Sequence, residues 1–427
     1  MRGREYPELG ERLYRTRLSS GLTYLAVPKP GFSGWTLLVR AAFGSVDTRW
    51  RADGETAAVP FGTAAVLAEA LTGGPFGDEL RAKGYAVDAR VTGDCTEFSV
   101  QGAGDAAEAA ELLLRMVTDR DSASADPAGA CRAVEWKERE RTPETLAMDG
   151  LRALLFAGHP MGEVFSGTFK GRAVIDGETL DRAYAAWYRP GSLALAAAGD
   201  LVPERVAEAA GNRSCAVYGE KAVSETPPLP PEEPEEPRLV METAYSGTFF
   251  SLGTRYAPAE DGPGMLRQRA IASLTARIAA GPSSPLLGEL TRRGVLPRRP
   301  DARILGCGAP MLALTGMSRD PSAVCAAFGE AAADLAARGP EHSALERAVR
   351  GETGAFLARL DRPWDLCSDL AEGWQYGYDA LTEPQIFSSV TPDELRRFAG
   401  DAITARRLAV AVVKHTENKE EAGKDND

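Results

Sequence analysis

Histidine, which binds zinc and transfers protons near neutral pH, is scarce in this chain of 427 residues. Its three copies, His159, His342 and His415, stand far apart, and none has a second His or a Cys at zinc-motif spacing. We expect His342 at the start of a helix and His415 at the end of the last strand, both at the surface. His159 stands in the turn sequence Gly158-His159-Pro160, where a histidine held by packing is the simplest interpretation.

Carboxylates and thiols are more abundant, but they form no recognisable site. Residues 135–144 alternate acidic and basic side chains, which is typical of one solvated helix face. There is no Gly-x-Ser-x-Gly nucleophile and no phosphate-binding loop. The six Cys have no close pair, which argues against disulfides and thiolate zinc sites and favours a reducing cytoplasm. These short motifs alone therefore reveal no active site.

Length and composition predict a soluble protein of two or three domains, at about 150 residues per domain. Hydrophobic residues make up 44% and charged residues 26%, an ordinary globular balance. No apolar run approaches the roughly 18 residues that would span a bilayer, and the first residues are too charged for a signal-peptide core. The net charge is −12, and the acidic segments 227–237 and 416–427 carry much of it. Without a basic face, nucleic-acid binding is not expected.

The clearest domain boundary is the Pro/Glu-rich segment 227–237, Pro-Pro-Leu-Pro-Pro-Glu-Glu-Pro-Glu-Glu-Pro. Its prolines forbid a helix and favour an extended spacer. It separates residues 1–226 from residues 238–415, and each part has the size of one domain. Residues 416–427 are expected to be a charged, disordered tail.

Periodicity predicts the same order of elements in both parts. In the first, we expect strands at 21–27, 35–43, 86–91, 95–101 and 193–198 and helices at 63–71, 77–83, 106–118, 127–156 and 177–187. In the second, we expect strands at 245–256, 302–305, 310–315 and 407–413 and helices at 264–280, 285–293, 322–337, 343–360, 364–374 and 392–403. The implied fold is α+β, with two related domains, each a mainly antiparallel sheet covered on one side by helices.

Sequence echoes favour an internal duplication. Residues 79–84 (Glu-Leu-Arg-Ala-Lys-Gly) match residues 289–294 (Glu-Leu-Thr-Arg-Arg-Gly) at an offset of 210 residues. The predicted final strands, which begin at Leu193 and Leu408, are offset by 215. Chance similarity between amphipathic helices is the alternative, but the shared offset and element order favour two homologous domains.

Several short stretches occur in an order that resembles a known family. They include Ser-Gly-Leu-Thr-Tyr-Leu at 20–25, Pro-Lys-Pro-Gly-Phe-Ser at 28–33, Phe-Gly-Ser-Val-Asp at 43–47, Gly-His-Pro at 158–160 and Trp-Tyr-Arg-Pro-Gly-Ser at 187–192. Residues 283–290 and 390–395 match more loosely. Together they resemble the pitrilysin/insulinase-like zinc metallopeptidases, most closely the bacterial branch. The resemblance implies a metallopeptidase-like fold of the LuxS/processing-peptidase type.

The chain departs from the family at the metal helix, residues 62–72. Family members read roughly Gly-x-Ala-His-x-x-Glu-His-x-Leu, whereas residues 62–71 read Gly-Thr-Ala-Ala-Val-Leu-Ala-Glu-Ala-Leu. The resemblance places Ala65 at the first zinc ligand, Ala68 at the general base, Glu69 at the second ligand and Glu135 at the third. A shift by one residue would put Glu69 at the general base, with both histidines still missing. Alanine offers neither a lone pair nor a base, so we expect no catalytic residue and no metal site in this chain. Ala65, Ala68 and Glu69 should share the inner face of one helix, with Glu135 approaching from a neighbouring helix.

The resemblance therefore implies a catalytically inactive homologue. Our leading hypothesis is a cytoplasmic non-catalytic subunit that pairs with a zinc-bearing catalytic chain to bind and process peptides, with zinc only in the partner. A stand-alone homo-oligomeric peptide-binding or scaffold protein is the alternative, and an enzyme using a carboxylate-only metal site at Glu69 and Glu135 is a further one. By resemblance, the substrate would lie along a sheet edge. The candidate edge strand, which could equally be internal, contains Cys95, Thr96, Glu97, Phe98 and Ser99.

Overall fold

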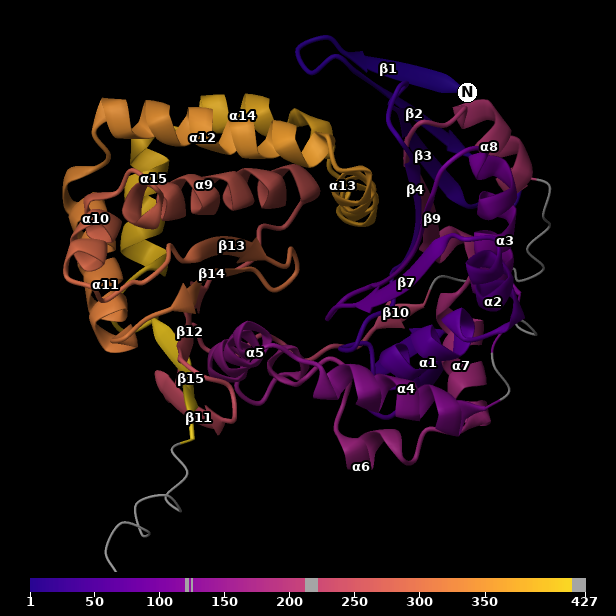
Figure 1. The fold of residues 1–427 in the computed structure, drawn as a ribbon, viewed down its shortest axis with the longest axis horizontal. Helices are drawn as coiled ribbons and strands as arrows, with labels where there is room; N and C mark the ends of the chain where they lie inside the picture. The colour runs from indigo at the N-terminus through magenta and orange to yellow at the C-terminus, as the bar shows by residue number, and fades with distance from the viewer. Residues whose placement is uncertain (120–122, 124–125, 212–221, 417–427) are drawn as a thin grey trace, which may run out of the picture.

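The computed structural model describes residues 1–119, 123, 126–211 and 222–416. The chain forms two large β-sheets, each packed against helices, and a small third sheet (Figure 1). This is the α+β architecture expected from the sequence. Nearly all of the predicted tail 416–427 lies outside the described residues.

The first large sheet has the strand order β1-β2-β3-β9-β4-β8-β7. Its strands are β1 (Arg2–Tyr6), β2 (Glu11–Arg17), β3 (Thr23–Pro28), β4 (Trp35–Ala41), β7 (Ala86–Val91), β8 (Thr96–Gly102) and β9 (Leu193–Gly199). Neighbouring strands are antiparallel except for β3 and β9, which are parallel. The sheet is therefore mixed but mainly antiparallel.

The second large sheet has the order β11-β15-β12-β14-β13, which repeats the part β3-β9-β4-β8-β7 of the first. The first two strands of this five-stranded unit are parallel in both sheets, and its other neighbours are antiparallel. Its strands are β11 (Arg238–Thr243), β12 (Thr248–Arg255), β13 (Asp301–Leu305), β14 (Met311–Met317) and β15 (Ala409–His415). The small sheet has the order β10-β5-β6, with β5 (Arg49–Ala52), β6 (Glu55–Ala58) and β10 (Val223–Ser224). Each half thus contains the same five-stranded unit, and the first half adds β1 and β2 at one edge.

Helices fill most of the remaining chain. Those of the first half are α1 (Thr63–Thr72), α2 (Pro75–Ala82), α3 (Ala106–Thr118), α4 (Pro127–Arg139), α5 (Pro143–Leu155), α6 (Phe169–Arg172), α7 (Gly177–Trp187) and α8 (Pro203–Gly211), with short 3-10 turns η2 (Pro160–Gly162) and η3 (Pro190–Ser192). Those of the second half are α9 (Gly262–Ala280), α10 (Pro285–Arg292), α11 (Pro321–Arg338), α12 (His342–Leu360), α13 (Pro363–Tyr376), α14 (Glu383–Ser389) and α15 (Pro392–Ala402), with η4 (Ala380–Thr382).

The two halves exchange one helix each. Helix α13 of the second half packs on β4 and β9 of the first sheet, and α5 of the first half packs on β12 and β15 of the second sheet (Figure 1). Alternate residues of β4 show the consequence, since Leu37 joins the core formed with the first half's own helices, whereas Leu38 joins the core formed with α13. Both large sheets are thus covered on both faces. The prediction that helices cover one side only is wrong.

The helix predicted over 127–156 is two helices, α4 and α5. Pro143 begins α5, because its ring cannot donate the backbone hydrogen bond that a continuous helix needs. The Thr142 side chain caps this start by accepting a hydrogen bond from the Thr145 N–H at 3.3 Å. The break allows α4 to pack on α1 of the first half while α5 crosses to the second sheet.

The segment 227–237 contains neither helix nor strand, and it lies against both halves. The Pro227 carbonyl contacts His159 of the first half at 3.0 Å, and Glu232 pairs with Arg407 of the second half at 2.5 Å. Leu229 packs beside α5 in the core of the second sheet. The extended conformation expected from its prolines therefore runs over the surface of the folded body.

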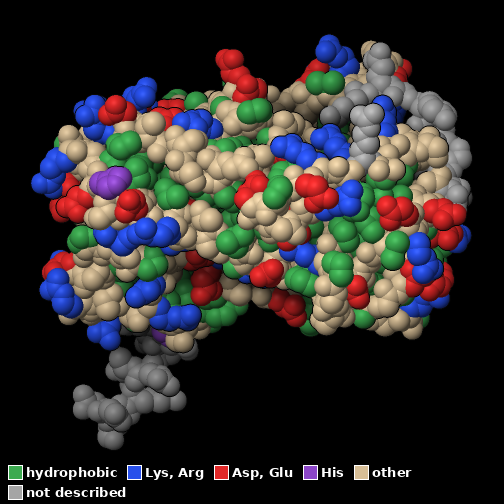
Figure 2. All heavy atoms as spheres, turned by 90° about the horizontal axis from the view of Figure 1, so that it is seen from above, with side chains coloured by type: hydrophobic (Ala, Val, Ile, Leu, Met, Phe, Trp, Pro, Cys, Tyr) green, Lys and Arg blue, Asp and Glu red, His purple; other side chains and the backbone are tan. Residues whose placement is uncertain are grey.

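Three further features bear on the environment of the molecule. Among the described residues, no helix combines the length and the apolar character that crossing a membrane requires. The five described cysteines are all free thiols. On the face in Figure 2, Lys and Arg side chains are interspersed with Asp and Glu side chains, so positive and negative charges offset each other there.

Candidate functional site

Helix α1 carries the residues that match the family's metal helix. Gly62 precedes it at φ 96°, and a Cβ there would lie 2.7 Å from the Ser166 carbonyl, so only glycine suits this close approach. Within α1, Ala65 and Ala68 are 8% and 1% exposed and belong to the core of the first sheet. The helix is therefore stabilised by burial of small apolar side chains at the positions where the family has chemistry.

Glu69 also lies on α1, and it meets a cation from the neighbouring helix α4. The Lys137 ammonium contacts the Glu69 carboxylate at 2.5 Å and Asp88 of β7 at 3.9 Å. Glu135 of α4 instead pairs with Arg139 on its own helix at 2.7 Å. Ala65 and Ala68 lie on the same helix as Glu69, as expected, but the α4 residue that reaches Glu69 is Lys137.

These residues do not fit the zinc ion that the fold family implies. Ala65 and Ala68 offer only methyl groups. The carboxylate of Glu69, at the second ligand position, already binds the ammonium group of Lys137. Within the part of the chain that the structure describes, no three His, Cys, Asp or Glu side chains gather in a group that could hold a metal ion.

The strand proposed for substrate binding is not at an edge. β8 pairs with β4 on one side and β7 on the other, so the edge-strand prediction for Cys95, Thr96, Glu97, Phe98 and Ser99 is wrong. All five residues are buried. The edge strand beside β8 is β7, whose alternating burial, unlike that of β8, is typical of a strand with one solvated face.

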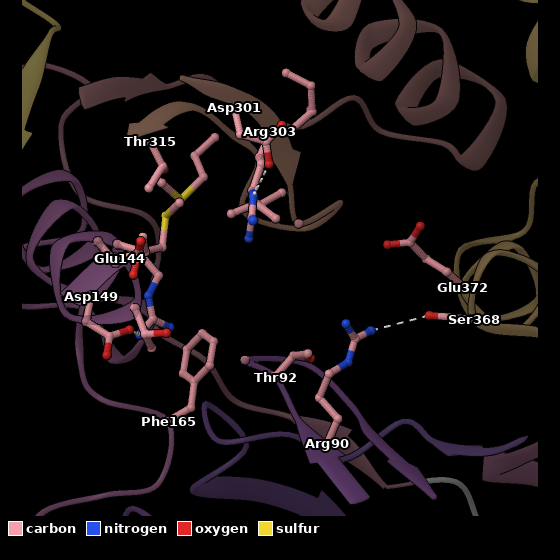
Figure 3. Close-up of a pocket in the computed structure, with 18 of the residues that line it drawn as sticks. Arg90, Thr92, Glu144, Asp149, Phe165, Asp301, Arg303, Thr315, Ser368 and Glu372 are labelled. Carbon is pink, nitrogen blue, oxygen red and sulfur yellow. Dashed lines mark hydrogen bonds and ion pairs between the residues drawn. The ribbon is translucent and has the colours of Figure 1, made fainter. Parts of the chain in front are cut away.

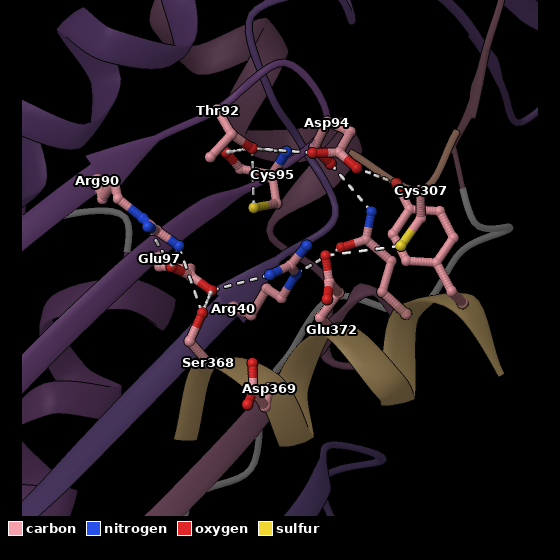
Figure 4. A network of polar contacts seen from close by, with 12 residues as sticks. Arg40, Arg90, Thr92, Asp94, Cys95, Glu97, Cys307, Ser368, Asp369 and Glu372 are labelled. Atoms are coloured by element: carbon pink, nitrogen blue, oxygen red, sulfur yellow. Dashed lines mark hydrogen bonds and ion pairs between the residues drawn. The ribbon is translucent and has the colours of Figure 1, made fainter. Parts of the chain in front are cut away.

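Glu97 instead anchors a buried polar network between the halves (Figure 4). Its carboxylate accepts hydrogen bonds from Arg40 at 2.8 Å and Arg90 at 2.7 Å, and from Ser368 of α13 at 2.9 Å. Arg40 and Glu97 are 4% and 1% exposed, and Arg40 also donates to Gln375 of α13 at 2.6 Å. The network thus joins the first sheet to a helix of the other half.

A second charged cluster surrounds the same face of α13. Arg269 of α9 pairs with Glu372 at 2.5 Å, and Arg359 of α12 contacts Asp369 at 3.2 Å. Burial alone would raise the pKa of Glu372, but Arg269 and Arg40 lower it to about 2. For Asp369 burial prevails over the neighbouring arginines and raises the pKa to about 6. Glu372 is therefore ionised at neutral pH and stabilises the cations around it.

A cavity of about 990 Å³ lies between the two halves. Figure 3 shows four walls: the ends of β7 and β8, helix α5, strands β13 and β14, and helix α13. Arg90 of β7 lines the cavity, and Asp88, two residues earlier on the same strand, contacts Lys137. Residues two apart on a strand face the same side, so the cavity begins next to the Lys137 contact. Such a volume, lined by mixed polar and apolar groups, is typical of a ligand site.

The three histidines lie apart from this cavity, and His159 is the most constrained. Its Nδ1 accepts the Met161 N–H at 3.0 Å, and its Nε2 lies 3.0 Å from the Pro227 carbonyl, to which it can donate. Burial lowers the pKa of His159, although the Pro227 contact opposes the change. A neutral histidine with both ring nitrogens occupied holds a turn, as the sequence predicts. His342 begins α12 and His415 ends β15.

No family model matches the chain. Among curated proteins, it is 24% identical over 243 residues to the uncharacterized zinc protease YmfH of Bacillus subtilis (strain 168). That match covers 55% of this chain and 56% of the relative, so it spans little more than half of that protein's length. Among solved structures, a putative M16-like peptidase from Alicyclobacillus acidocaldarius superposes with a TM-score of 0.86, over 97% of this chain and 100% of the other, at 20% identity.

This chain has the M16 peptidase fold. The resemblance to the pitrilysin-like, or M16, peptidases is thereby confirmed. A peptidase M16 inactive domain from Pseudomonas fluorescens has the same fold, with a TM-score of 0.75 and 17% identity over 95% of this chain and 98% of that one. Both structures are at most 20% identical to this chain, so the comparison shows a shared fold and does not show a shared activity.

Sequence reasoning missed three groups of residues that the M16 fold brings to this site. Lys137 was one of several charges on a helix face, and its partner Glu69 is 68 residues away. Arg40 was an isolated charge in an apolar strand, which was the available signal for a buried ion pair. Arg298 and Arg299 are adjacent in the sequence and Arg303 is four residues further on, but only the tertiary structure shows that they line a cavity.

Proposed function

We propose that this chain is a non-catalytic M16 subunit, which binds peptides in the cavity between its halves while a zinc-bearing partner of the same fold cleaves them. The observation that carries the proposal is the contrast between two regions. The metal helix is packed with the methyl groups of Ala65 and Ala68, and its Glu69 is held by Lys137. The adjoining cavity retains about 990 Å³ and charged, accessible walls.

The fold supports a role in holding peptides. Open sheet edges at β7 and β13 both border the cavity, and an extended peptide can add to such an edge through main-chain hydrogen bonds. The half-buried pair of Arg269 with Glu372 of α13, and the buried Arg40–Glu97 pair that hydrogen-bonds to α13, hold this wall in place, so the site is formed before a ligand enters. In this proposal the subunit supplies grip and selectivity, and the partner supplies the metal and the hydrolytic water. The free thiols of the five cysteines that the structure describes suit the cytoplasm as its location.

The first experiment is co-purification from the native source with this chain as bait, followed by zinc and peptidase assays on each component. The expected result is recovery of an M16 chain of similar size with an intact His-x-x-Glu-His motif, and hydrolysis only by the pair. Recovery of this chain alone, peptide-binding but inert, would favour the homo-oligomeric scaffold. Metal-dependent hydrolysis by the isolated chain would overturn the proposal and favour a site at Glu69 and Glu135.

A further inference from the structure

One wall of the cavity carries positive charge at its rim. Strand β13 follows the sequence Pro297-Arg298-Arg299-Pro300, in which two prolines restrict the backbone on either side of the arginines. Arg298, Arg299 and Arg303 are exposed and line the cavity. Arg303 pairs with Asp301 on its own strand at 2.9 Å, whereas the described residues form no ion pair with Arg298 or Arg299.

The same wall has an open strand edge. β13 pairs with β14 on one side, and none of the described strands pairs with its other side. Four of its five residues line the cavity. From β7, the other open edge, only Arg90 does so, and its guanidinium is already held by Glu97, Ser368 and the ring of Trp364. β13 is therefore the better placed edge for an added strand.

Apolar side chains lie beyond the arginines along the same strand face. Leu305 is two residues from Arg303, so the two side chains project on one face of β13, and Leu305 packs in the core beside α5. Met148 and Met161 pack in that same cluster, and they line the cavity with Phe165 as half-buried residues. Methionine adapts to side chains of varied shape, so this end suits apolar groups of several sizes.

We propose that the open edge of β13 binds an extended peptide with acidic side chains at Arg298, Arg299 and Arg303, and with apolar side chains two and four residues further on. This deepens the proposed function, since it rests on the cavity being a peptide site, and it names the peptide class. The preference for acidic side chains follows from their charge complementarity to the arginines. The spacing follows because every second side chain of a strand lies on the same face. A peptide and its reverse distinguish the two possible strand directions.

The test uses the full chain and fluorescein-labelled nonapeptides followed by fluorescence anisotropy. The probes are Glu-Thr-Thr-Thr-Glu-Thr-Leu-Thr-Leu, whose two acids have the spacing of Arg299 and Arg303, its reverse, and the same two sequences with Lys in place of Glu. We expect one acidic peptide to bind at least about tenfold more tightly than its Lys counterpart at low salt. Arg298→Ser with Arg299→Ser should weaken that binding about tenfold, whereas the matched double variant Arg396→Ser with Arg397→Ser, on exposed α15 positions, should change it less than about twofold.

Two further peptides test strand addition itself. Alternate backbone amides of the binding peptide are N-methylated, in one peptide at odd positions and in the other at even positions. Because only alternate amides of an added strand face the edge, one of the two should lose at least about tenfold in affinity and the other little.

The remaining outcomes separate this inference from the function it rests on. Tight binding that ignores both the β13 arginines and N-methylation would overturn the β13 site and leave a peptide-binding cavity. Failure of every peptide to bind would overturn both. Circular dichroism of the variants, whose changed side chains are exposed, verifies that they remain folded.

Discussion

Glu97 is the residue at which the consequence of burial is clearest. Two cations and a hydroxyl share its carboxylate, and its side chain is 1% exposed. Taking these charges out of water is costly, so each depends on the others for compensation. Glu97 therefore belongs to the buried contact between the two halves, where a peptide cannot reach it.

Glu97→Gln should accordingly destabilise the protein strongly. The substitution leaves Arg40 buried without an opposite charge at 2.8 Å, and loss of one partner of a buried pair costs about 3–5 kcal/mol. The matched control is Glu178→Gln, which breaks an exposed pair with Arg182 and should cost less than about 1 kcal/mol. Denaturant unfolding of both variants measures the difference. Equal losses would show that the buried pair carries no special weight.

Asp47 gives a pH-dependent prediction. It is 6% exposed and accepts the Gly44 N–H at 2.7 Å, and burial raises its pKa to about 7 despite that hydrogen bond. Because the pKa in the folded state lies above the usual 3.8, the folded state binds this proton more tightly. Its contribution to stability is present below about pH 4 and is lost as the pH rises towards 7.

Asp47→Asn removes this titration while keeping an acceptor for Gly44. Relative to the variant, the native chain should therefore lose up to about 4 kcal/mol of unfolding free energy between about pH 4 and pH 7, at about 1.4 kcal/mol per pKa unit. Denaturant titrations of both proteins across this range provide the comparison. Parallel pH profiles would mean that Asp47 titrates normally in the folded state.

The sequence places some residues of the site correctly, and others only the fold can place. Ala65, Ala68 and Glu69 share α1 because a helix brings positions three and four apart onto one face. Lys137 and Glu97 were beyond prediction, since each acquires its role from a partner on another element. An ion pair across 68 residues leaves no trace in local spacing.

At the scale of elements, the contact of α5 with the second sheet depends on Gly150. A Cβ added there would lie 2.9 Å from the Ala411 Cβ and 2.7 Å from the Met241 terminal methyl. Ala411 belongs to the rigid strand β15, so the helix would have to move. Small size at one helix position thus allows a helix of one half to pack closely on the sheet of the other.

Gly150→Ala should destabilise the protein by about 1–3 kcal/mol, the usual cost of overpacking, even though alanine favours helix. Gly354→Ala on α12 is the matched control, because nothing lies within 4 Å of its added Cβ. That substitution should stabilise by up to about 1 kcal/mol. Thermal unfolding of the two variants should move in opposite directions, and a shift in the same direction would contradict the close packing of α5.

The burial of the strands explains why the strands were predicted correctly, whereas the helices that cover their faces were not. β4 and β9 are buried along their whole length, and their mainly apolar sequences indicate strands covered on both faces. The second cover comes from a helix more than 150 residues away, and its identity follows from tertiary structure alone. β1, β2 and the strands of the small sheet have a weak hydrophobic pattern and were not predicted. Their place also follows from tertiary structure alone.

At the scale of the whole molecule, the exchanged helices make the halves interdependent. Without α13, the faces of β4 and β9 that carry Leu38 and Ala196 would be open to water. Without α5, the apolar face of β15 would be exposed. Apolar surface of this kind contributes roughly 25 cal/mol per Å² when buried, so a separated half loses much of its stability.

We therefore expect one cooperative unfolding transition for the full chain and no stable fold for residues 1–226 alone. Circular dichroism and intrinsic fluorescence should report the same midpoint in denaturant. Co-expression of 1–226 with 227–427 should restore a folded complex. Two resolved transitions, or a cooperatively folded 1–226 fragment, would show that the exchanged helices are dispensable.

The central proposal is that this chain, which has the M16 fold, binds peptides for a partner that cleaves them. Its most direct test is peptide hydrolysis by the zinc-bearing partner, measured while this chain is titrated in. The account predicts no hydrolysis by this chain alone, little by the partner alone, and a rate that saturates at one copy of each. Metal-dependent hydrolysis by this chain alone, or full activity of the partner without it, would contradict the account.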